Sequence, residues 1–419
     1  MQRLIIKGGK RLCGEIKVQG AKNSALPLLA GCLLAEGRTV LTRCPELSDV
    51  FTACRILNEL GCKCSFRDNT AVTDTSGAEG FCISEALMRE MRSSIVFMGA
   101  VLGRTGKCEL SYPGGCELGP RPIDMHITAL RQLGVKISEE HGRISCVCPK
   151  GIRGAVIDLP FPSVGATENI MLAAVCGEGE TLIRNAAREP EIRDLAALLN
   201  RCGADIRGAG CSTIRINGVK SLHGCEYEVM PDRIAAATYM AAAATTGGEL
   251  GLLGVNCEDV RAVTAVFEEM GAAVYCPENS IFISCARPLR AVRMIRTMPY
   301  PGFPTDAQAV VMAALATARG SSMIAENIFE CRYRHVDELV RMGADIKTSG
   351  RTAVIQGVSR LYGANVMAHE LRGGAALVAA ALGAEGMTAV SGVQYIDRGY
   401  EQIERAFGSL GADIRRAFG

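Results

Sequence analysis

Hydrophobic and polar positions along the chain follow a pattern that recurs at intervals of about 70 residues. In each copy, an amphipathic helix ends in a large apolar residue or a cysteine, which is followed by glycine and then by strand-like alternation. Glycine suits this position because the backbone after a helix often takes a left-handed conformation that other residues resist. The six copies place it at Gly61, Gly134, Gly203, Gly271, Gly343 and Gly411. The stretches that follow predict β-hairpins.

Alanine-rich segments alternate with these signatures and are apolar on nearly all sides. Each follows a short strand and a polar or glycine-rich corner, and its composition predicts a buried helix. The copy at residues 87–110 is looser than the others. Each unit therefore reads β-α-β-α-β-β, and six units predict an α/β protein with two domains of three units each. A solenoid is the competing interpretation, but solenoid repeats are usually shorter and their helices are not buried on all sides.

Charged and polar side chains stand at the first turns of the buried helices. A helix N-terminus has unpaired N–H groups and about half a positive charge, so cations are disfavoured there. Three starts nevertheless carry a cation: Lys22, Arg92 and Arg372. A bound phosphate or carboxylate would explain them. Three other starts carry Ser163, Asp232 and Asp306, which also suit the ordinary N-cap role.

Composition limits the class of protein. The chain has 419 residues, of which 48% are hydrophobic and 21% charged, and its net charge is +2. This balance gives no global attraction for nucleic acid or for an anionic membrane. The N-terminal sequence does not match a signal peptide, and no apolar run is long enough to span a bilayer. We therefore expect a cytoplasmic protein without nucleic-acid partners or membrane insertion.

Nineteen cysteines are scattered through the chain without C-x-x-C spacing. In a cytosolic protein they are expected to be reduced thiols. Two C-x-C pairs lie in strand-like stretches with no histidine nearby in sequence, so structural zinc is not expected. Cys116 differs from the rest because it follows Pro-Gly-Gly and precedes Gly-Pro-Arg-Pro. Such a run is typical of an exposed loop, whereas free cysteines usually lie in cores.

The motifs together resemble the enolpyruvyl transferase family, in its branch that acts on UDP-N-acetylglucosamine. The matching stretches are GAKNSALPLLA, PGGCELGPRPIDMH, FPSVGATENIM, NAAREPEI, MPDRI, FPTDAQA, ENIFECRYRHVDEL and IDRGYE. The resemblance implies two inside-out α/β domains, each with three βαβαββ repeats around buried parallel helices. One domain would hold residues 1–21 and 230–419. The other would hold residues 22–229 with the Cys116 loop, and the active site would lie in the cleft between the domains.

This resemblance implies a reaction. The enolpyruvyl group of phosphoenolpyruvate would pass to the 3-hydroxyl of UDP-N-acetylglucosamine, by addition and elimination through a tetrahedral intermediate that releases phosphate. In the family this is the first committed step of bacterial peptidoglycan synthesis. The partners are then two small-molecule substrates, the expected oligomeric state is a monomer, and no cofactor or metal is implied.

The resemblance also assigns residue roles. Cys116 would donate a proton and form a covalent adduct with phosphoenolpyruvate, and Asp306 would deprotonate the sugar hydroxyl. The predicted catalytic set is Cys116, Asp306, Lys22 and Arg398. Phosphoenolpyruvate would be bound by Lys22, Asn23, Arg121 and Arg398. Contacts to the UDP-sugar would come from Arg92, Arg121, Pro122, Ile123, Asp124, Met125, Ser163, Val164, Gly165, Asp306 and Ile328. Active-site side chains that support closure would be Arg332, Glu370 and Arg372.

Residue chemistry agrees with these roles. Planar guanidinium groups bind phosphate and carboxylate oxygens in pairs, and general acid–base catalysis needs one proton donor and one acceptor. A cysteine on a loop can close over substrate and exclude water. Nearby arginines favour a thiolate, whereas a proton donor must stay protonated, and the bound anionic substrate would offset those cations.

The sequence departs from the family pattern at one place. The usual Asp-Leu-Arg before the last buried helix is Glu370-Leu371-Arg372, and Gly373-Gly374 follows where a small residue and serine are expected. A catalytically weak or silent paralogue that binds UDP-N-acetylglucosamine is therefore an alternative. The related enzyme of the shikimate pathway is less favoured, because its first corner usually reads G-S-K-S rather than G-A-K-N and it lacks the cysteine loop.

Overall fold

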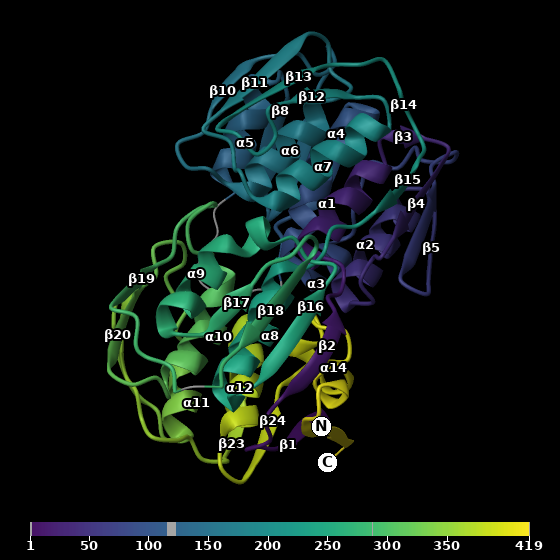
Figure 1. Ribbon diagram of the computed structural model, residues 1–419. Helices are drawn as coiled ribbons and strands as arrows, with labels where there is room; N and C mark the ends of the chain where they lie inside the picture. Colours follow the sequence, from purple (N-terminus) through teal and green to yellow (C-terminus); the bar gives the residue numbers. More distant parts are fainter. Residues whose placement is uncertain (1, 115–122, 287, 419) are drawn as a thin grey trace. The chain divides into compact units, whose positions relative to one another are not determined.

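The computed structural model of the chain describes residues 2–114, 123–286 and 288–418. It is a mixed α/β structure whose contacts divide the chain into two compact units (Figure 1). Unit 1 joins the residues up to Gln19 with those from Pro231 onwards. Unit 2 runs from Gly20 to Met230, apart from residues 115–122.

Unit 2 contains three copies of the repeat. The first has α1 (Lys22–Cys32), β4 (Arg38–Thr42), α2 (Ser48–Glu59), β5 (Lys63–Arg67), β6 (Thr70–Asp74) and, from later in the chain, β15 (Glu226–Glu228). The second has α3 (Glu85–Glu90), η1 (Arg92–Val96), α4 (Phe97–Thr105), β7 (Lys107–Ser111), α5 (Asp124–Gln132), β8 (Lys136–Glu140) and β9 (Arg143–Val147). The third has β10 (Val156–Asp158), α6 (Val164–Ala174), β11 (Glu180–Arg184), α7 (Pro190–Arg201), β12 (Asp205–Arg207) and β13 (Thr213–Asn217). A two-stranded pair is formed by β3 (Ala35–Glu36) and β14 (Leu222–His223).

Unit 1 also contains three copies. The first has β2 (Cys13–Lys17), α8 (Arg233–Thr246), β16 (Glu249–Leu253), η2 (Cys257–Val260), α9 (Arg261–Met270), β17 (Ala273–Tyr275) and β18 (Ser280–Ser284). The second has β19 (Met294–Arg296), α10 (Thr305–Leu315), β20 (Ser321–Ala325), α11 (Val336–Arg341), β21 (Asp345–Ser349) and β22 (Thr352–Gln356). The third has β23 (Asn365–Met367), α12 (Leu371–Gly383), β24 (Met387–Ser391), α13 (Val393–Ile396), α14 (Ile403–Ser409), β25 (Asp413–Phe418) and the N-terminal strand β1 (Gln2–Lys7).

The four-stranded sheets share one topology. In β10-β11-β13-β12, the first two strands are parallel and joined through a buried helix, and an antiparallel hairpin completes the sheet. The order β19-β20-β22-β21 repeats this arrangement. In the last sheet, β23-β24-β1-β25, the N-terminal strand takes the third position, which β13 holds in the first sheet described, and it pairs antiparallel with both neighbours. The predicted βαβαββ repeat is confirmed.

Buried helices form the centre of each unit, and the sheets lie around them. In unit 1, α8, α10 and α12 each pack against the other two, and the strands of that unit surround them in Figure 1. Their alanines, such as Ala241, Ala313 and Ala379, are fully buried. Small side chains allow these helices to pack closely. In unit 2, α4 packs against α6 in the same way. The buried helices are as predicted from the sequence, and their arrangement is the inside-out one that the family resemblance implies.

The six repeat glycines all adopt the left-handed backbone conformation, with φ between 92° and 104°. At Gly61 a Cβ atom would also lie 2.3 Å from the carbonyl oxygen of Gly77. Both observations explain why the position after each amphipathic helix is glycine.

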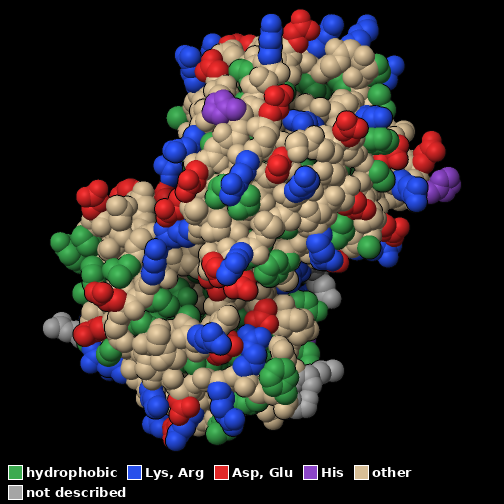
Figure 2. All heavy atoms as spheres, turned by 90° about the vertical axis from the view of Figure 1, so that its right-hand side faces the viewer, with side chains coloured by type: hydrophobic (Ala, Val, Ile, Leu, Met, Phe, Trp, Pro, Cys, Tyr) green, Lys and Arg blue, Asp and Glu red, His purple; other side chains and the backbone are tan. Residues whose placement is uncertain are grey.

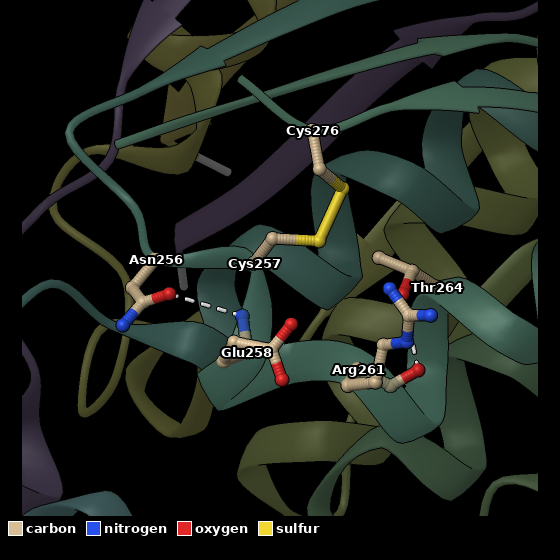
Figure 3. Close-up of a disulfide and its surroundings, with 6 residues drawn as sticks. All are labelled: Asn256, Cys257, Glu258, Arg261, Thr264 and Cys276. Atoms are coloured by element: carbon tan, nitrogen blue, oxygen red, sulfur yellow. Dashed lines mark hydrogen bonds between the residues drawn. A yellow bond between two sulfur atoms is a disulfide. The ribbon is translucent and has the colours of Figure 1, made fainter. Parts of the chain in front are cut away.

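One expectation about the cysteines is wrong. Cys257 and Cys276 form a disulfide (Figure 3), whereas all nineteen cysteines are expected from the sequence to be reduced. The two Cα atoms are 6.0 Å apart, a usual separation for such a bridge, because η2 and the end of β17 adjoin in the folded unit. Sixteen other cysteines in the described part of the chain are free thiols.

Surface charge is mixed in the view of Figure 2, where acidic and basic side chains are interspersed. Within the described residues, none of the helices has the length and apolar character needed to cross a membrane.

Candidate functional site

Asp306 and Arg332 form a close ion pair in unit 1. Nη2 of Arg332 lies 2.7 Å from Oδ1 of Asp306, and it also donates to the carbonyl oxygen of Thr305 at 3.4 Å. Asp306 occupies the first turn of α10, and the N-cap is Pro304, so the alternative that Asp306 is an N-cap is wrong. The side chain of Arg332 is 2% exposed and that of Asp306 is 29% exposed. Part of the Asp306 side chain is therefore exposed to solvent.

Arg372 approaches the same carboxylate from the first turn of α12. Its Nη2 lies 3.8 Å from Oδ2 of Asp306, and its Nη1 donates to the hydroxyl of Tyr400 at 3.3 Å. The Tyr400 hydroxyl is also 2.7 Å from that of Thr238 on α8. Burial alone would lower the pKa of Arg372, but Tyr400, Asp306 and Asp232 outweigh it and raise that pKa. Arg372 thus remains a buried cation held at the starts of α8, α10 and α12.

Glu370 is the N-cap of α12. Its carboxylate accepts hydrogen bonds from the backbone N–H groups of Arg372, at 2.8 Å, and of Gly373. The second interaction leaves no room for a side chain at residue 373, where a Cβ atom would lie 2.6 Å from Oε1 of Glu370 and 2.9 Å from Cβ of His335. Oε2 of Glu370 lies 3.8 Å from Nη1 of Arg332. Glu370, which stands where the family pattern has aspartate, therefore keeps a carboxylate next to Arg332. Glycine at residue 373 leaves room for the longer side chain of Glu370.

Arg398 lies in the turn between α13 and α14. The turn is held by Gln19, which donates to the carbonyl oxygen of Gly399 and accepts from the N–H of Glu401, both at 3.0 Å. Arg398 is two residues from Tyr400, whose hydroxyl contacts Arg372. The predicted residues Asp306, Arg332, Glu370 and Arg372 are thus directly connected, and Arg398 is linked to them along the chain.

Lys22 is the first residue of α1 in unit 2, and it is buried. Its Nζ lies 2.5 Å from Oδ2 of Asp49, which belongs to the first turn of α2 and is 3% exposed. The predicted partner Asn23 is exposed. Sequence reasoning missed Asp49, because an acidic residue in the first turn of a helix is common and gives no sign of its partner.

The starts of α5 and α6 lie together in unit 2. Gly165 is so close to His126 that a Cβ atom would lie 3.1 Å from Cε1 of the imidazole. His126 accepts at Nδ1 from the side-chain amide of Asn169, at 2.8 Å, and Asn169 also accepts from the N–H of Gly99. Ser163 is the N-cap of α6 and accepts from the N–H of Ala166 at 3.3 Å. This packing brings two predicted segments together, residues 123–125 and residues 163–165.

His126 stays neutral at physiological pH. Burial, and then the positive charge of Arg92, lower its pKa to about 4. Arg92 stands at the start of η1, is half-buried and donates to the carbonyl oxygen of Pro113 at 3.1 Å. Arg92 therefore belongs to the same cluster as the starts of α5 and α6. His126 and Asn169 connect the starts of these helices, and neither is among the site residues predicted from the sequence.

Three predicted residues lie outside the described part of the chain: Cys116, Arg121 and Pro122. The remaining predicted residues lie in both units. In unit 1, Asp306, Arg332, Glu370 and Arg372 form one connected cluster. In unit 2, Arg92 lies near the starts of α5 and α6, and Lys22 pairs separately with Asp49. Cations near helix starts suit densely charged anions such as phosphates and carboxylates. In the described ranges, no group of three or more His, Cys, Asp or Glu residues is arranged to hold a metal ion.

The chain is similar to known proteins over nearly its whole length. Residues 6–407 match the sequence profile of EPSP synthase (3-phosphoshikimate 1-carboxyvinyltransferase). The chain is 51% identical to UDP-N-acetylglucosamine 1-carboxyvinyltransferase 2 of Caldanaerobacter subterraneus subsp. tengcongensis, over 99% of this chain and 100% of that protein. It is 50% identical to UDP-N-acetylglucosamine 1-carboxyvinyltransferase 1 of Symbiobacterium thermophilum, over 99% of this chain and 95% of that protein.

Solved structures share the fold. The enolpyruvyl transferase NikO from Streptomyces tendae superposes with a TM-score of 0.89 at 23% identity, covering 100% of this chain and 99% of that chain. An EPSP synthase from Acinetobacter baumannii superposes with a TM-score of 0.79 at 21% identity, covering 100% of both chains. The expected fold class is confirmed.

Proposed function

We propose that the chain is a transferase that moves the enolpyruvyl group of phosphoenolpyruvate to the 3-hydroxyl of UDP-N-acetylglucosamine. The chain belongs to the EPSP synthase (3-phosphoshikimate 1-carboxyvinyltransferase) family. This transfer is a step of peptidoglycan synthesis. The observation that carries the choice of acceptor is the identity of 51%, over almost the full length, to a relative named for UDP-N-acetylglucosamine. The shikimate-pathway alternative receives no comparable support, since the EPSP synthase structure is only 21% identical.

The reaction is an addition followed by an elimination. Cys116 protonates the methylene carbon of phosphoenolpyruvate while Asp306 removes the proton of the sugar hydroxyl, whose oxygen attacks the adjacent carbon. The tetrahedral intermediate then expels phosphate and loses a proton, which leaves the enol ether. Cys116 also forms the covalent adduct with phosphoenolpyruvate, and it is the residue that fosfomycin alkylates.

Cations of both units stabilise the charge that develops. Lys22, Asn23, Arg121 and Arg398 bind phosphoenolpyruvate, and residues 92, 121–125, 163–165 and 328 bind the UDP-sugar. The buried state of Arg332 and Arg372 supports this role, because a fixed cation in an environment of low polarity stabilises an anion more strongly than a solvated one. The partial exposure of Asp306 supports its role as base, since 29% of its side chain is exposed although two arginines approach it.

A silent paralogue remains the second candidate, and the contacts of Glu370 argue against it. Its carboxylate caps α12 and lies 3.8 Å from Arg332, so the residue that departs from the family pattern still holds the cluster together. We place the enzyme in the cytoplasm as a monomer, where it would serve cell-wall synthesis during growth and division.

Phosphate release tests the proposal. Release that requires both phosphoenolpyruvate and UDP-N-acetylglucosamine is the expected result. Binding of the UDP-sugar without any release would identify a silent paralogue, and release with shikimate 3-phosphate as acceptor would identify the shikimate-pathway reaction.

A further inference from the structure

Glu326 is a fully buried carboxylate in unit 1 that none of the proposed catalytic steps uses. It directly follows β20, and the residue is 1% exposed. A buried carboxylate is costly unless its oxygens accept hydrogen bonds, so its partners indicate what it stabilises.

Its two oxygens accept four hydrogen bonds from three different segments. Oε1 accepts from the hydroxyl of Thr297 and from the N–H of Ile328, both at 2.9 Å, and from the N–H of Phe329 at 3.1 Å. Oε2 accepts from the hydroxyl of Thr305 at 2.9 Å. Thr297 in turn accepts from the N–H of Asn327 at 2.8 Å.

Three of these partners belong to or adjoin the candidate site: Thr305, Ile328 and Phe329. Thr305 is the first residue of α10 and precedes Asp306. Ile328 is a predicted sugar contact, and the ring of Phe329 lies 5.6 Å from the guanidinium carbon of Arg332. Arg332 in turn donates a hydrogen bond to Asp306. One carboxylate therefore fixes both chain segments that bring Asp306 and Arg332 within 2.7 Å of each other.

We propose that Glu326 is a positioning residue for the transfer reaction, which holds the start of α10 and the 327–332 segment in the geometry that the base Asp306 needs. The inference deepens the proposed function and rests on it. Its action is indirect, because its side chain bonds to Thr297, Thr305, Ile328 and Phe329 and not to Asp306 itself.

The contacts predict how substitutions rank. Glu326→Ala removes all four acceptor interactions. Glu326→Gln retains one oxygen for the two backbone N–H groups, and its amide can donate to the Thr305 hydroxyl, which rotates to accept. Thr305→Val breaks only the link to α10. A matched control is Glu338→Ala, which removes another buried carboxylate of unit 1 whose backbone partner is the N–H of Met367.

Kinetics of phosphate release separate positioning from general stability. We expect kcat of Glu326→Ala to fall about 100-fold, with a smaller change in KM, because displaced catalytic groups cost this much. Glu326→Gln should keep activity near that of the wild type, and Thr305→Val should lose about tenfold, the effect of one hydrogen bond. Glu338→Ala should keep kcat even if its unfolding temperature falls. The proposal is overturned if Glu326→Ala and the control lose activity equally, or if Thr305→Val is fully active.

A crystal structure of Glu326→Gln and one of Thr305→Val test the inference independently of turnover. The Arg332–Asp306 separation should stay near 2.7 Å in the first and should lengthen beyond hydrogen-bond distance in the second. An unchanged separation in Thr305→Val would overturn the positioning role. If the wild-type enzyme releases no phosphate, the proposed function fails, and these structures still decide whether Glu326 sets the Asp306 geometry.

Discussion

The guanidinium group of Arg332 donates to Asp306 at 2.7 Å, although one side chain is almost completely buried and the other is partly open. The carboxylate of Asp306 is thus held in a fixed orientation, while 29% of the side chain is exposed. Arg372 approaches its second oxygen at 3.8 Å, so two cations from different segments define where the carboxylate can lie.

Asp306→Asn should lower kcat by a factor of about 10² to 10⁴, because the amide retains an acceptor for Arg332 but cannot take a proton from the sugar hydroxyl. Phosphate release under saturating substrates measures this. Asp345→Asn, at an exposed position on β21, is the matched control and should behave as the wild type. Full activity of Asp306→Asn would remove this residue from the role of base.

Lys22→Gln should reduce both activity and stability, because it removes the cation next to the buried carboxylate of Asp49. Removing one partner of a buried ion pair typically costs about 3 kcal/mol in the free energy of unfolding. The double variant Lys22→Gln with Asp49→Asn should regain most of the stability, measured by denaturant unfolding, while activity stays low. Recovery of activity in the double variant would show that Lys22 serves only the fold.

Stability should fall as pH drops from about 6.5 towards 4, and His126 should account for part of this fall. Its pKa is about 4 in the folded protein and near 6.5 when unfolded, so the unfolded chain binds more protons within this window. At pH 5, which lies 1.5 units below the pKa of the unfolded state, this effect lowers the free energy of unfolding by about 2 kcal/mol.

His126→Gln should flatten this pH dependence of the unfolding free energy. His223→Gln, which changes an exposed histidine of the same unit, should leave it as in the wild type. His335 will continue to contribute, because burial lowers its pKa to about 4 as well. Equal slopes in His126→Gln and the wild type would contradict the assignment.

Cys116→Ala should abolish phosphate release, and Cys116→Asp should retain some activity because it keeps an acid at this position. Fosfomycin should add covalently to the wild-type protein at Cys116 and should leave the Asp variant unmodified, as measured by mass spectrometry of the peptide. Cys211→Ala, which changes an exposed cysteine in the described part of the chain, serves as the control. Normal turnover of Cys116→Ala would refute the proton-donor role.

Cys257→Ser should destabilise unit 1. The bridge joins residues 19 positions apart, and closing a loop of this size in the unfolded chain is worth about 3 kcal/mol in the chain-entropy model. Unfolding with and without a thiol reductant measures the effect, and Cys331→Ser controls for loss of an exposed free thiol. Alkylation of Cys257 in the native protein without reductant would contradict the bridge.

Local patterns in the sequence predict the repeats well. The six glycines that end the amphipathic helices, and the buried alanine-rich helices, are each specified within a few residues, by backbone conformation and by side-chain size. The N-cap roles of Ser163 and Asp232 are confirmed for the same reason, since an N-cap bonds to residues two or three positions away.

Long-range partners could not be predicted in this way. The Lys22–Asp49 pair spans 27 residues, and the Thr238–Tyr400 contact spans 162. Periodicity shows that a side chain is buried, but it does not show which distant segment covers it. Glu326 illustrates this, because it begins a recognisable motif while its function depends on Thr297 and Thr305 in earlier segments.

The placement of β1 has a consequence for biosynthesis. This strand pairs with β24 and β25, which lie at the far end of the chain, and β2 pairs with β16. The ribosome therefore releases two strands that have no partners at first, and β1 must wait for about 400 further residues, roughly 20 to 80 seconds of translation. During that time the emerging N-terminus is a natural client for chaperones, and a fusion partner attached there would delay the closing of the last sheet.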